Sequence, residues 1–201
     1  LMAVTKTVEP VYINRALDLG ADLIGENRVQ EYLGKRDALH LDGVEKHLIG
    51  RLQTNKVKYI VGQVDMIQSV DSMKLAQEIS KQSVKHGVTT RVLVEVNIGR
   101  EAAKSGFAPE KVLPAAEAAL ERTHVRVRGL MTIPPADAQR DANFRYFQEV
   151  QALYVDMNQK LFHNELEYLS MGMSGDYEDA IRAGATMVRV GSAIFGARHY
   201  N

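Results

Sequence analysis

The chain has 201 residues, of which 25 are basic and 25 are acidic, and it contains no cysteine. The even charge balance gives no indication of a nucleic-acid or membrane partner, and the lack of cysteine excludes disulfides, thiolate metal sites and cysteine nucleophiles. No apolar run approaches the roughly 20 residues of a transmembrane helix, and residues 1–20 lack the basic flank and cleavage site of a signal peptide. We therefore expect a soluble, cytoplasmic protein.

Short apolar runs alternate with amphipathic segments along the whole chain. The chain opens directly on a predicted strand, which suggests that an N-terminal helix is absent from this sequence. Thr7 and Pro10 suit the start of the first helix. The predicted strands are 1–6, 22–27, 47–50, 66–70, 91–97, 127–133, 168–171 and 187–190, and the predicted helices are 10–19, 29–39, 54–60, 73–85, 109–122, 141–161 and 176–183.

Eight strands that alternate with helices, without a hairpin signal between them, predict a parallel sheet with helices outside it. Eight parallel strands close a (β/α)8 TIM-like barrel, which typically has about 250 residues, so this would be a compact example. An open, doubly wound sheet is the alternative, but the glycine-rich turn that usually follows its first strand is absent. No linker divides the sequence. We expect one α/β barrel domain over residues 1–201.

Candidate ligand-binding residues are concentrated in residues 170–196, where two apolar runs each end in glycine and serine. A turn over 172–175 precedes a helix that Ser174 is predicted to cap, and Gly191 and Ser192 open a second turn. Free backbone N–H groups at such turns attract anions, so two turns on adjacent strands predict a phosphate site. In the alternative interpretation these residues are ordinary loop residues and Ser174 is only an N-cap.

Two cations are predicted to face these turns. Alternation along the last strand places Met187, Arg189 and Gly191 on one face, and a buried guanidinium needs a ligand or a carboxylate as its partner. Lys6 ends the first strand, which neighbours the eighth strand in a closed barrel. Taken alone, Lys6 would be interpreted as a surface lysine. Its convergence with the phosphate turns instead favours a desolvated amine that attacks an aldehyde.

A family resemblance rests on runs of sequence spread over the whole chain. They are AVTKT (3–7), GENRVQE (25–31), HLIGRLQTNK (47–56), SVDS (69–72), KSG (104–106), GLMTIPP (129–135), SMGMSGD (170–176) and VRVGSAIFG (188–196). In this order they resemble the YggS/PROSC family of pyridoxal phosphate homeostasis proteins. The resemblance implies a barrel similar to the N-terminal domain of bacterial alanine racemase and of eukaryotic ornithine decarboxylase. It also implies pyridoxal 5′-phosphate (PLP) as cofactor.

The resemblance assigns roles to individual residues. Lys6 matches the lysine that forms a Schiff base with PLP, and Arg189 matches the arginine that faces the pyridine nitrogen. Ser174, Gly191 and Ser192 match the phosphate-binding positions. Together they would hold the cofactor at its aldehyde, ring and phosphate.

Further positions are assigned less directly by the resemblance. Asn27 matches a residue close to the cofactor. His47, Ile49 and Met171 fall at strand ends near the ring, where ordinary barrel packing explains them equally well. Arg28 stands where many family members have tyrosine, which would alter the rim of the pocket.

The predicted function is that of a PLP-binding protein without strong catalytic turnover. A pyridine nitrogen that faces a permanent cation stays unprotonated, so the ring is a weaker electron sink. Racemases of related fold also need an acid/base residue from a second domain, for which this chain has no room. We expect a monomer that buffers PLP and delivers it to PLP-dependent apoenzymes. A small racemase-like enzyme, and an aldolase that binds a sugar phosphate, are the alternatives.

Overall fold

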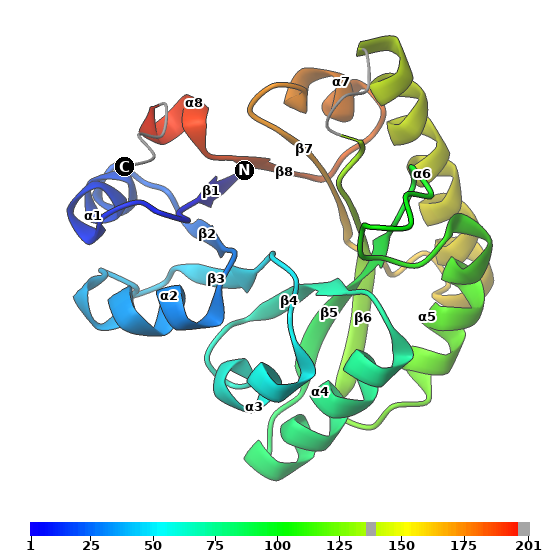
Figure 1. The fold of residues 1–201 in the computed structure, drawn as a ribbon, viewed down its shortest axis with the longest axis horizontal. Helices are drawn as coiled ribbons and strands as arrows, with labels where there is room; N and C mark the ends of the chain where they lie inside the picture. Colours follow the sequence, from blue (N-terminus) through cyan, green and yellow to red (C-terminus); the bar gives the residue numbers. More distant parts are fainter. Residues whose placement is uncertain (136–139, 197–201) are drawn as a thin grey trace.

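The computed structural model describes residues 1–135 and 140–196, except for the side chain of Arg140. Its centre is a closed barrel of parallel strands (Figure 1). Each strand pairs with the next one in the sequence, and the last pairs with the first, where Met2 lies opposite Arg189. The predicted (β/α)8 barrel is therefore confirmed. The strands are β1 (Met2–Val4), β2 (Leu23–Glu26), β3 (Glu45–Leu48), β4 (Met66–Val70), β5 (Thr90–Val96), β6 (Val125–Thr132), β7 (Tyr168–Met173) and β8 (Met187–Val190).

Helices surround the strands on the outside of the barrel (Figure 1). One of them shows how local sequence sets the limits of an element: Ser72 accepts a hydrogen bond from the Leu75 N–H at its start, and Gly87 ends it in a left-handed conformation at φ 65°. The α-helices are α1 (Pro10–Asp18), α2 (Val29–Lys35), α3 (Val57–Ile60), α4 (Met73–His86), α5 (Val112–Leu120), α6 (Arg140–Leu161), α7 (Tyr177–Arg182) and α8 (Ser192–Phe195). Short 3₁₀ segments are η1 (Arg36–Ala38), η2 (Thr54–Lys56) and η3 (Pro109–Lys111).

Some element boundaries differ from the predicted ones. The third strand begins at Glu45, two residues earlier than predicted, because polar partners satisfy its charged start: the Lys46 N–H donates to Asp65 at 2.8 Å, and Arg91 contacts Glu45 at 2.6 Å. The seventh strand continues to Met173, which still pairs with Arg189 across a register shift. The extension of the seventh strand brings Met173 into the lining of the site.

The core has two layers. Between the barrel and the helices lies a large apolar cluster that includes Phe147, Ile79 and Met171. The interior of the barrel holds smaller apolar clusters, formed by Met2, Val4, Ile49 and Met187 and by Met66, Leu93 and Met131. Buried polar side chains share this interior with them, among them His47, Gln68, Ser170 and Arg189.

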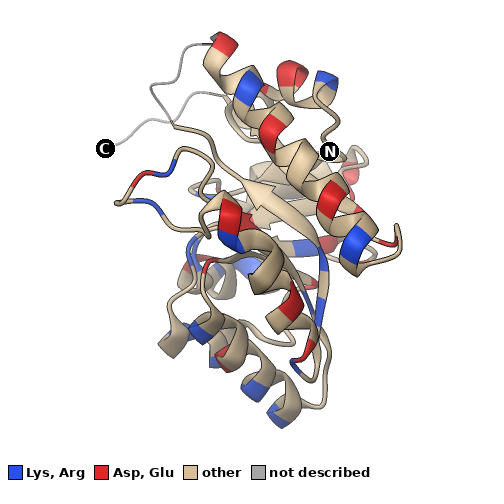
Figure 2. Cartoon of the chain, turned by 90° about the vertical axis from the view of Figure 1, so that its right-hand side faces the viewer, with Lys and Arg blue, Asp and Glu red and all other residues tan. Residues whose placement is uncertain are grey.

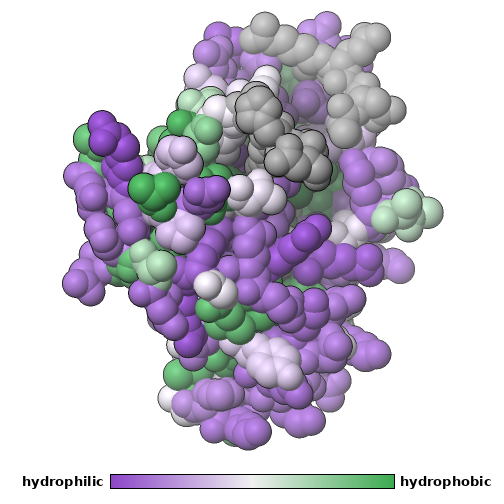
Figure 3. All heavy atoms as spheres, turned by 60° about the vertical axis from the view of Figure 1, so that its left-hand side comes forward, coloured by the Kyte–Doolittle hydropathy of each residue, from purple (hydrophilic) through white to green (hydrophobic). Residues whose placement is uncertain are grey.

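The outer surface is mixed in charge. Figure 2 shows acidic and basic residues interspersed over the helices. The side that carries α1 and α2 is mainly hydrophilic, with small separate apolar areas (Figure 3). In the described part of the chain, no helix combines the length and apolar character that a membrane span requires.

Candidate functional site

The residues singled out by the sequence line one cavity of about 320 Å³ at the carboxyl ends of the strands. This is the end of a (β/α)8 barrel at which ligands bind. Lys6 and Asn27 follow β1 and β2, while the remaining residues come from β7, β8 and the turns after them. The structure thus brings together Lys6, Asn27, Ser174, Arg189, Gly191 and Ser192, and adds Val4, Ile49, Ile133, Met173 and Gly175 to the lining.

Ser174 joins the two turns that were predicted to hold a phosphate. Its Oγ accepts the Gly191 N–H at 3.1 Å and the Ala193 N–H at 3.4 Å. The expectation that Ser174 caps the following helix is wrong, because Asp176 occupies the N-cap position of α7. Since β7 extends to Met173, Ser174 lies against the start of α8 instead. The Ser174 hydroxyl therefore ties the turn after β7 to the turn after β8 in one wall of the cavity.

Lys6 is half-buried in the neighbouring wall, since β1 pairs with β8, and contacts outside the barrel fix its main chain. The Lys35 Nζ donates to the Thr5 carbonyl oxygen at 2.8 Å, and the Thr5 hydroxyl donates to Glu26 at 3.1 Å. On the other side of Lys6, the Thr7 N–H donates to a Glu31 carboxylate, and Thr7 adopts a left-handed φ of 60°. The backbone on both sides of Lys6 is thereby anchored.

These anchors centre on a buried ion pair that the sequence analysis missed. Lys35 contacts Glu26 directly and Glu31 at 3.1 Å. Burial raises the pKa of Glu26, and the neighbouring Lys35 opposes this rise. The available signal was a lysine four residues after Glu31 in the expected helix, a spacing that places both on one helix face.

Arg189 is only 3% exposed and lies at the base of the cavity. Its Nη1 donates to the Ser170 hydroxyl and its Nη2 to the Thr132 carbonyl oxygen, both at 2.8 Å. Among the described residues no carboxylate lies within ion-pair distance of Arg189, so its partners are neutral oxygens. Burial lowers the pKa of Arg189 to about 10, while Asp176 and Glu95 oppose the decrease. The guanidinium remains a cation at neutral pH.

Ile49, His47 and Met171, for which the sequence did not decide between cofactor contact and barrel packing, lie at different depths in the structure. Ile49 lines the cavity. His47 is buried deeper inside the barrel, where its Nδ1 accepts a hydrogen bond from Gln68 at 2.8 Å. Met171 belongs to the apolar layer between the barrel and the helices. Only Ile49 is therefore placed to contact a ligand.

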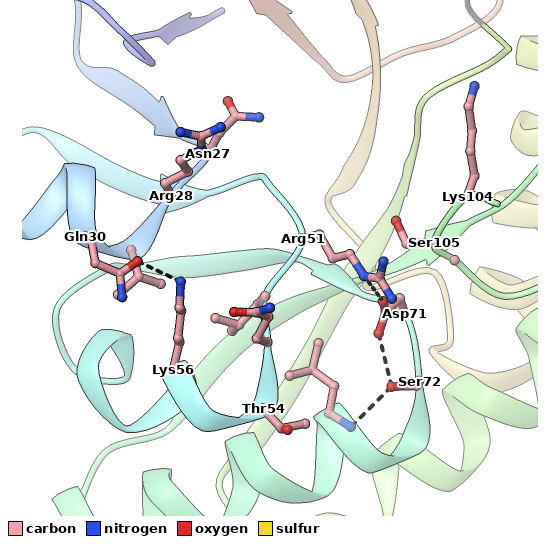
Figure 4. A pocket seen from close by; sticks show the side chains of 15 residues that line it. Asn27, Arg28, Gln30, Arg51, Thr54, Lys56, Asp71, Ser72, Lys104 and Ser105 are labelled. Atoms are coloured by element: carbon pink, nitrogen blue, oxygen red, sulfur yellow. Dashed lines mark hydrogen bonds and ion pairs between the residues drawn. The ribbon is translucent and has the colours of Figure 1, made fainter.

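A larger cavity of about 820 Å³ adjoins the first, and Asn27 lines both (Figure 4). Lys56 contacts Gln30 at 3.0 Å, and Arg51 lies 3.7 Å from Asp71. Because cations outnumber anions here, the cavity has a positive field that attracts anionic ligands. The sequence analysis did not identify this basic lining, which comes from loops after β2, β3 and β5. Its charged members are Arg28, Arg51, Lys56, Lys104 and Asp71.

Comparison with known proteins defines the class of this barrel and then the family. Residues 1–199 match the family described as alanine racemase, N-terminal domain. The chain is 45% identical over 200 residues to the pyridoxal phosphate homeostasis protein of Aquifex aeolicus, of which it covers 87%. It is 36% identical over 204 residues to the protein of that name in Escherichia coli K12, of which it covers 86%. The chain therefore belongs to the YggS/PROSC family of pyridoxal phosphate homeostasis proteins, as the resemblance predicted.

Solved structures agree with this assignment. PipY of Synechococcus elongatus without PLP matches with a TM-score of 0.92 and 32% identity, over 97% of this chain and 91% of PipY. The same protein with PLP bound matches with a TM-score of 0.88 and 30% identity, over 98% of this chain and 92% of PipY. Alanine racemase of Clostridium difficile matches at 18% identity and a TM-score of 0.76, with 52% of its length covered, which shows a shared barrel fold.

Proposed function

We propose that this protein binds PLP as a reversible Schiff base on Lys6 and acts in PLP homeostasis. The observation that carries the proposal is the single cavity in which Lys6 faces the turns around Ser174 and Gly191. Membership of the family supports it, and so does the PLP-bound structure of PipY.

The residues that line the cavity fit the groups of PLP. The cofactor supplies an aldehyde that condenses reversibly with a primary amine, and Lys6 is the lysine in this cavity. The Ser192 N–H and the Ser174 hydroxyl, which also accepts the Gly191 N–H, would hold the phosphate, and Arg189 would face the pyridine nitrogen. Asn27 Oδ1 is buried without a hydrogen-bond partner among the described residues, so it would gain one from a polar ligand.

The same lining supports a binding role rather than catalytic turnover. Among the described residues around the cavity, Lys6 and Arg189 are the titratable groups. An enzyme that moves protons on both faces of an amino acid needs a second acid/base group. A cationic Arg189 also keeps the pyridine nitrogen unprotonated, which weakens the ring as an electron sink. We propose a monomer that stores PLP in the cytoplasm and releases it to PLP-dependent apoenzymes.

The test is an absorption spectrum of the purified protein before and after PLP addition, followed by borohydride reduction and peptide mass mapping. We expect a visible band in the wild type whose reduced adduct maps to Lys6, and no band in Lys6→Ala. Lys56→Ala, which changes the adjoining cavity, is the matched control and should keep the band. An adduct spread over several surface lysines would refute the proposed site.

A second measurement separates storage from racemase-like turnover. The PLP-loaded protein is incubated with single L-amino acids, and the products are resolved by chiral chromatography. A carrier should give no enantiomer above the level of free PLP. Accumulation of the D-enantiomer that depends on Lys6 would instead support an enzyme.

A further inference from the structure

A row of buried, hydrogen-bonded side chains crosses the interior of the barrel from Arg189 to β3. Arg189 Nη1 lies 2.8 Å from the Ser170 hydroxyl, which lies 2.7 Å from Gln68 Oε1. Gln68 Nε2 lies 2.8 Å from His47 Nδ1. The contact between Gln68 on β4 and Ser170 on β7 joins strands that are not neighbours in the barrel. Ser170, Gln68 and His47 are at most 1% exposed.

The donor and acceptor roles along this row follow from Arg189. A guanidinium only donates, so Ser170 Oγ accepts a hydrogen bond from Arg189. The Ser170 hydroxyl in turn donates a hydrogen bond to Gln68. Gln68 must then present its oxygen to Ser170 and its nitrogen to His47. As a result His47 Nδ1 is an acceptor, and a neutral His47 carries its proton on Nε2.

A second contact favours the same orientation of Gln68. Its Nε2 also lies 3.1 Å from the sulfur of Met187, a weak acceptor. A rotated amide would place its oxygen against this sulfur, which has no proton to donate. The amide is therefore held in one orientation from two sides.

The far end of the row reaches charged groups at the other end of the barrel. His47 Nε2 lies 3.1 Å from Glu45 Oε1, close but poorly aligned for a hydrogen bond, and Glu45 is paired with Arg91 at 2.6 Å. Burial lowers the pKa of His47, with Arg91 acting in the same direction and Glu45 and Asp65 opposing it. A neutral His47 keeps Nδ1 free to accept from Gln68.

We propose that Ser170, Gln68 and His47 are positioning residues of the cofactor site, which fix the guanidinium of Arg189 through the interior of the barrel. Two of the five N–H groups of Arg189 are held by Ser170 and Thr132, so the plane of the guanidinium cannot rotate. Its remaining N–H groups are left for the ligand cavity. The inference rests on the proposed function, because it concerns how that site holds the pyridine ring.

A purely structural explanation accounts less well for this row. Apolar side chains such as Met66 and Leu93 fill neighbouring parts of the same interior. Buried polar groups must all be satisfied to avoid a desolvation cost, and well-packed apolar residues of similar size are often at least as stabilising. The row gives the barrel a defined orientation of Arg189, which an apolar interior would not provide.

The first test compares Ser170→Ala with Ser69→Ala. Both substitutions remove one buried hydroxyl, but Ser69 donates to the Gly50 carbonyl oxygen at 2.7 Å and lies outside the row. We measure the dissociation constant for PLP, the pH titration of the visible band on Lys6 and the unfolding of the apoprotein. Ser170→Ala should raise the dissociation constant about tenfold and shift the titration midpoint, because Arg189 loses a charge-assisted hydrogen bond. Ser69→Ala should change only the unfolding.

The second test concerns the far end of the row. His47→Leu removes the acceptor of Gln68 and should weaken PLP binding, whereas His47→Asn keeps an acceptor near the place of Nδ1 and should largely restore it. In Ser170→Ala/His47→Leu the two effects should not add, because the row is already interrupted.

The outcomes separate this inference from the proposed function. A wild-type protein without a Lys6 band overturns both. A normal Lys6 band together with equal PLP binding and equal pH titrations in Ser170→Ala and Ser69→Ala overturns only the positioning role. Additive effects in the double variant overturn the link to His47.

Discussion

Lys35 forms a buried ion pair with Glu26 directly behind the main chain that carries Lys6. The two side chains are 9% and 2% exposed. Lys35 also donates to the Thr5 carbonyl oxygen at 2.8 Å, and Glu26 accepts from the Thr5 hydroxyl at 3.1 Å. The pair therefore joins α2 to the end of β1, where the proposed Schiff-base lysine begins.

Removal of the Lys35 charge should lower the free energy of unfolding substantially. In Lys35→Met the Glu26 carboxylate stays buried without its cation, and breaking such a pair typically costs about 3–5 kcal/mol. Urea unfolding measures the loss. Lys160→Met is the control, because Lys160 pairs with Asp156 on an exposed surface of α6 and should change stability by less than about 1 kcal/mol. Equal losses in the two variants would contradict the structural role assigned to Lys35.

Replacement of Glu26 as well should recover part of this loss. Lys35→Met/Glu26→Leu leaves no buried charge behind, and apolar replacements of a buried pair are often neutral. The double variant should be clearly more stable than Lys35→Met in the same urea titration. If it is less stable, the hydrogen bond of Glu26 to Thr5 matters more than the charge.

Glu95 is a second buried carboxylate, and it makes stability depend on pH. Burial raises its pKa above the ordinary value of 4.5, and Oε2 has no hydrogen-bond partner in the part of the chain that the structure describes. The Glu95 carboxyl therefore binds a proton more tightly in the folded protein than in the unfolded chain. The resulting stability is present below about pH 4.5 and is lost as pH rises through the raised pKa of the folded state.

Glu95→Gln should remove this pH dependence. The variant keeps an oxygen for the Ser105 hydroxyl, which donates to Glu95 at 2.8 Å, but it avoids a buried charge. Its unfolding free energy relative to wild type should increase as pH rises from 4.5, to a gain of about 1–3 kcal/mol at pH 7. Urea titrations across this pH range measure the gain. The exposed Glu117→Gln should show no such trend, and a parallel pH profile for Glu95→Gln would argue against the raised pKa.

The fold was predictable from sequence because it rests on local signals. Apolar runs at the spacing of strands and helix-start signals such as Pro10 lie within a few residues of the element that they define. The placement of Lys6 near Arg189 was also predictable, since barrel closure makes the first and last strands neighbours.

The rest of the site depends on contacts between residues far apart in the sequence. Gln68 and Ser170 are 102 positions apart and meet only because the barrel closes around them. Ser174 was predicted to cap the helix that follows it, because the apolar pattern placed the end of the seventh strand at Met171. The pairing that extends this strand to Met173 is not visible in the apolar pattern. Lys35 could not be identified from the sequence, since nothing local reveals a partner on another element.

Gly50 is required by the close approach of two strand ends. A Cβ at this position would lie 2.2 Å from the Asn27 carbonyl oxygen and 2.8 Å from its Cα. Gly50→Ala should therefore displace Asn27, with a loss of about 1–3 kcal/mol and weaker PLP binding. Gly34→Ala is the control: a Cβ at Gly34 in α2 would meet no other part of the described structure within 4 Å, and the variant should gain about 0.5–1 kcal/mol. Thermal unfolding and PLP titration of both variants measure these effects.

Ser174→Ala separates the role of this hydroxyl in ligand binding from its role in stability. The variant loses the acceptor for the N–H groups of Gly191 and Ala193, and should lose about 1 kcal/mol of stability, as for a helix cap. Ser72→Ala should cost a similar amount, because Ser72 accepts from the Leu75 N–H at 3.3 Å at the start of α4. Calorimetric titration with PLP should show an affinity about tenfold weaker for Ser174→Ala, since the phosphate turns lose their connection, and near wild type for Ser72→Ala. If both variants bind PLP equally well, Ser174 only stabilises the loop, and the phosphate is held by the backbone of Gly191 and Ser192 alone.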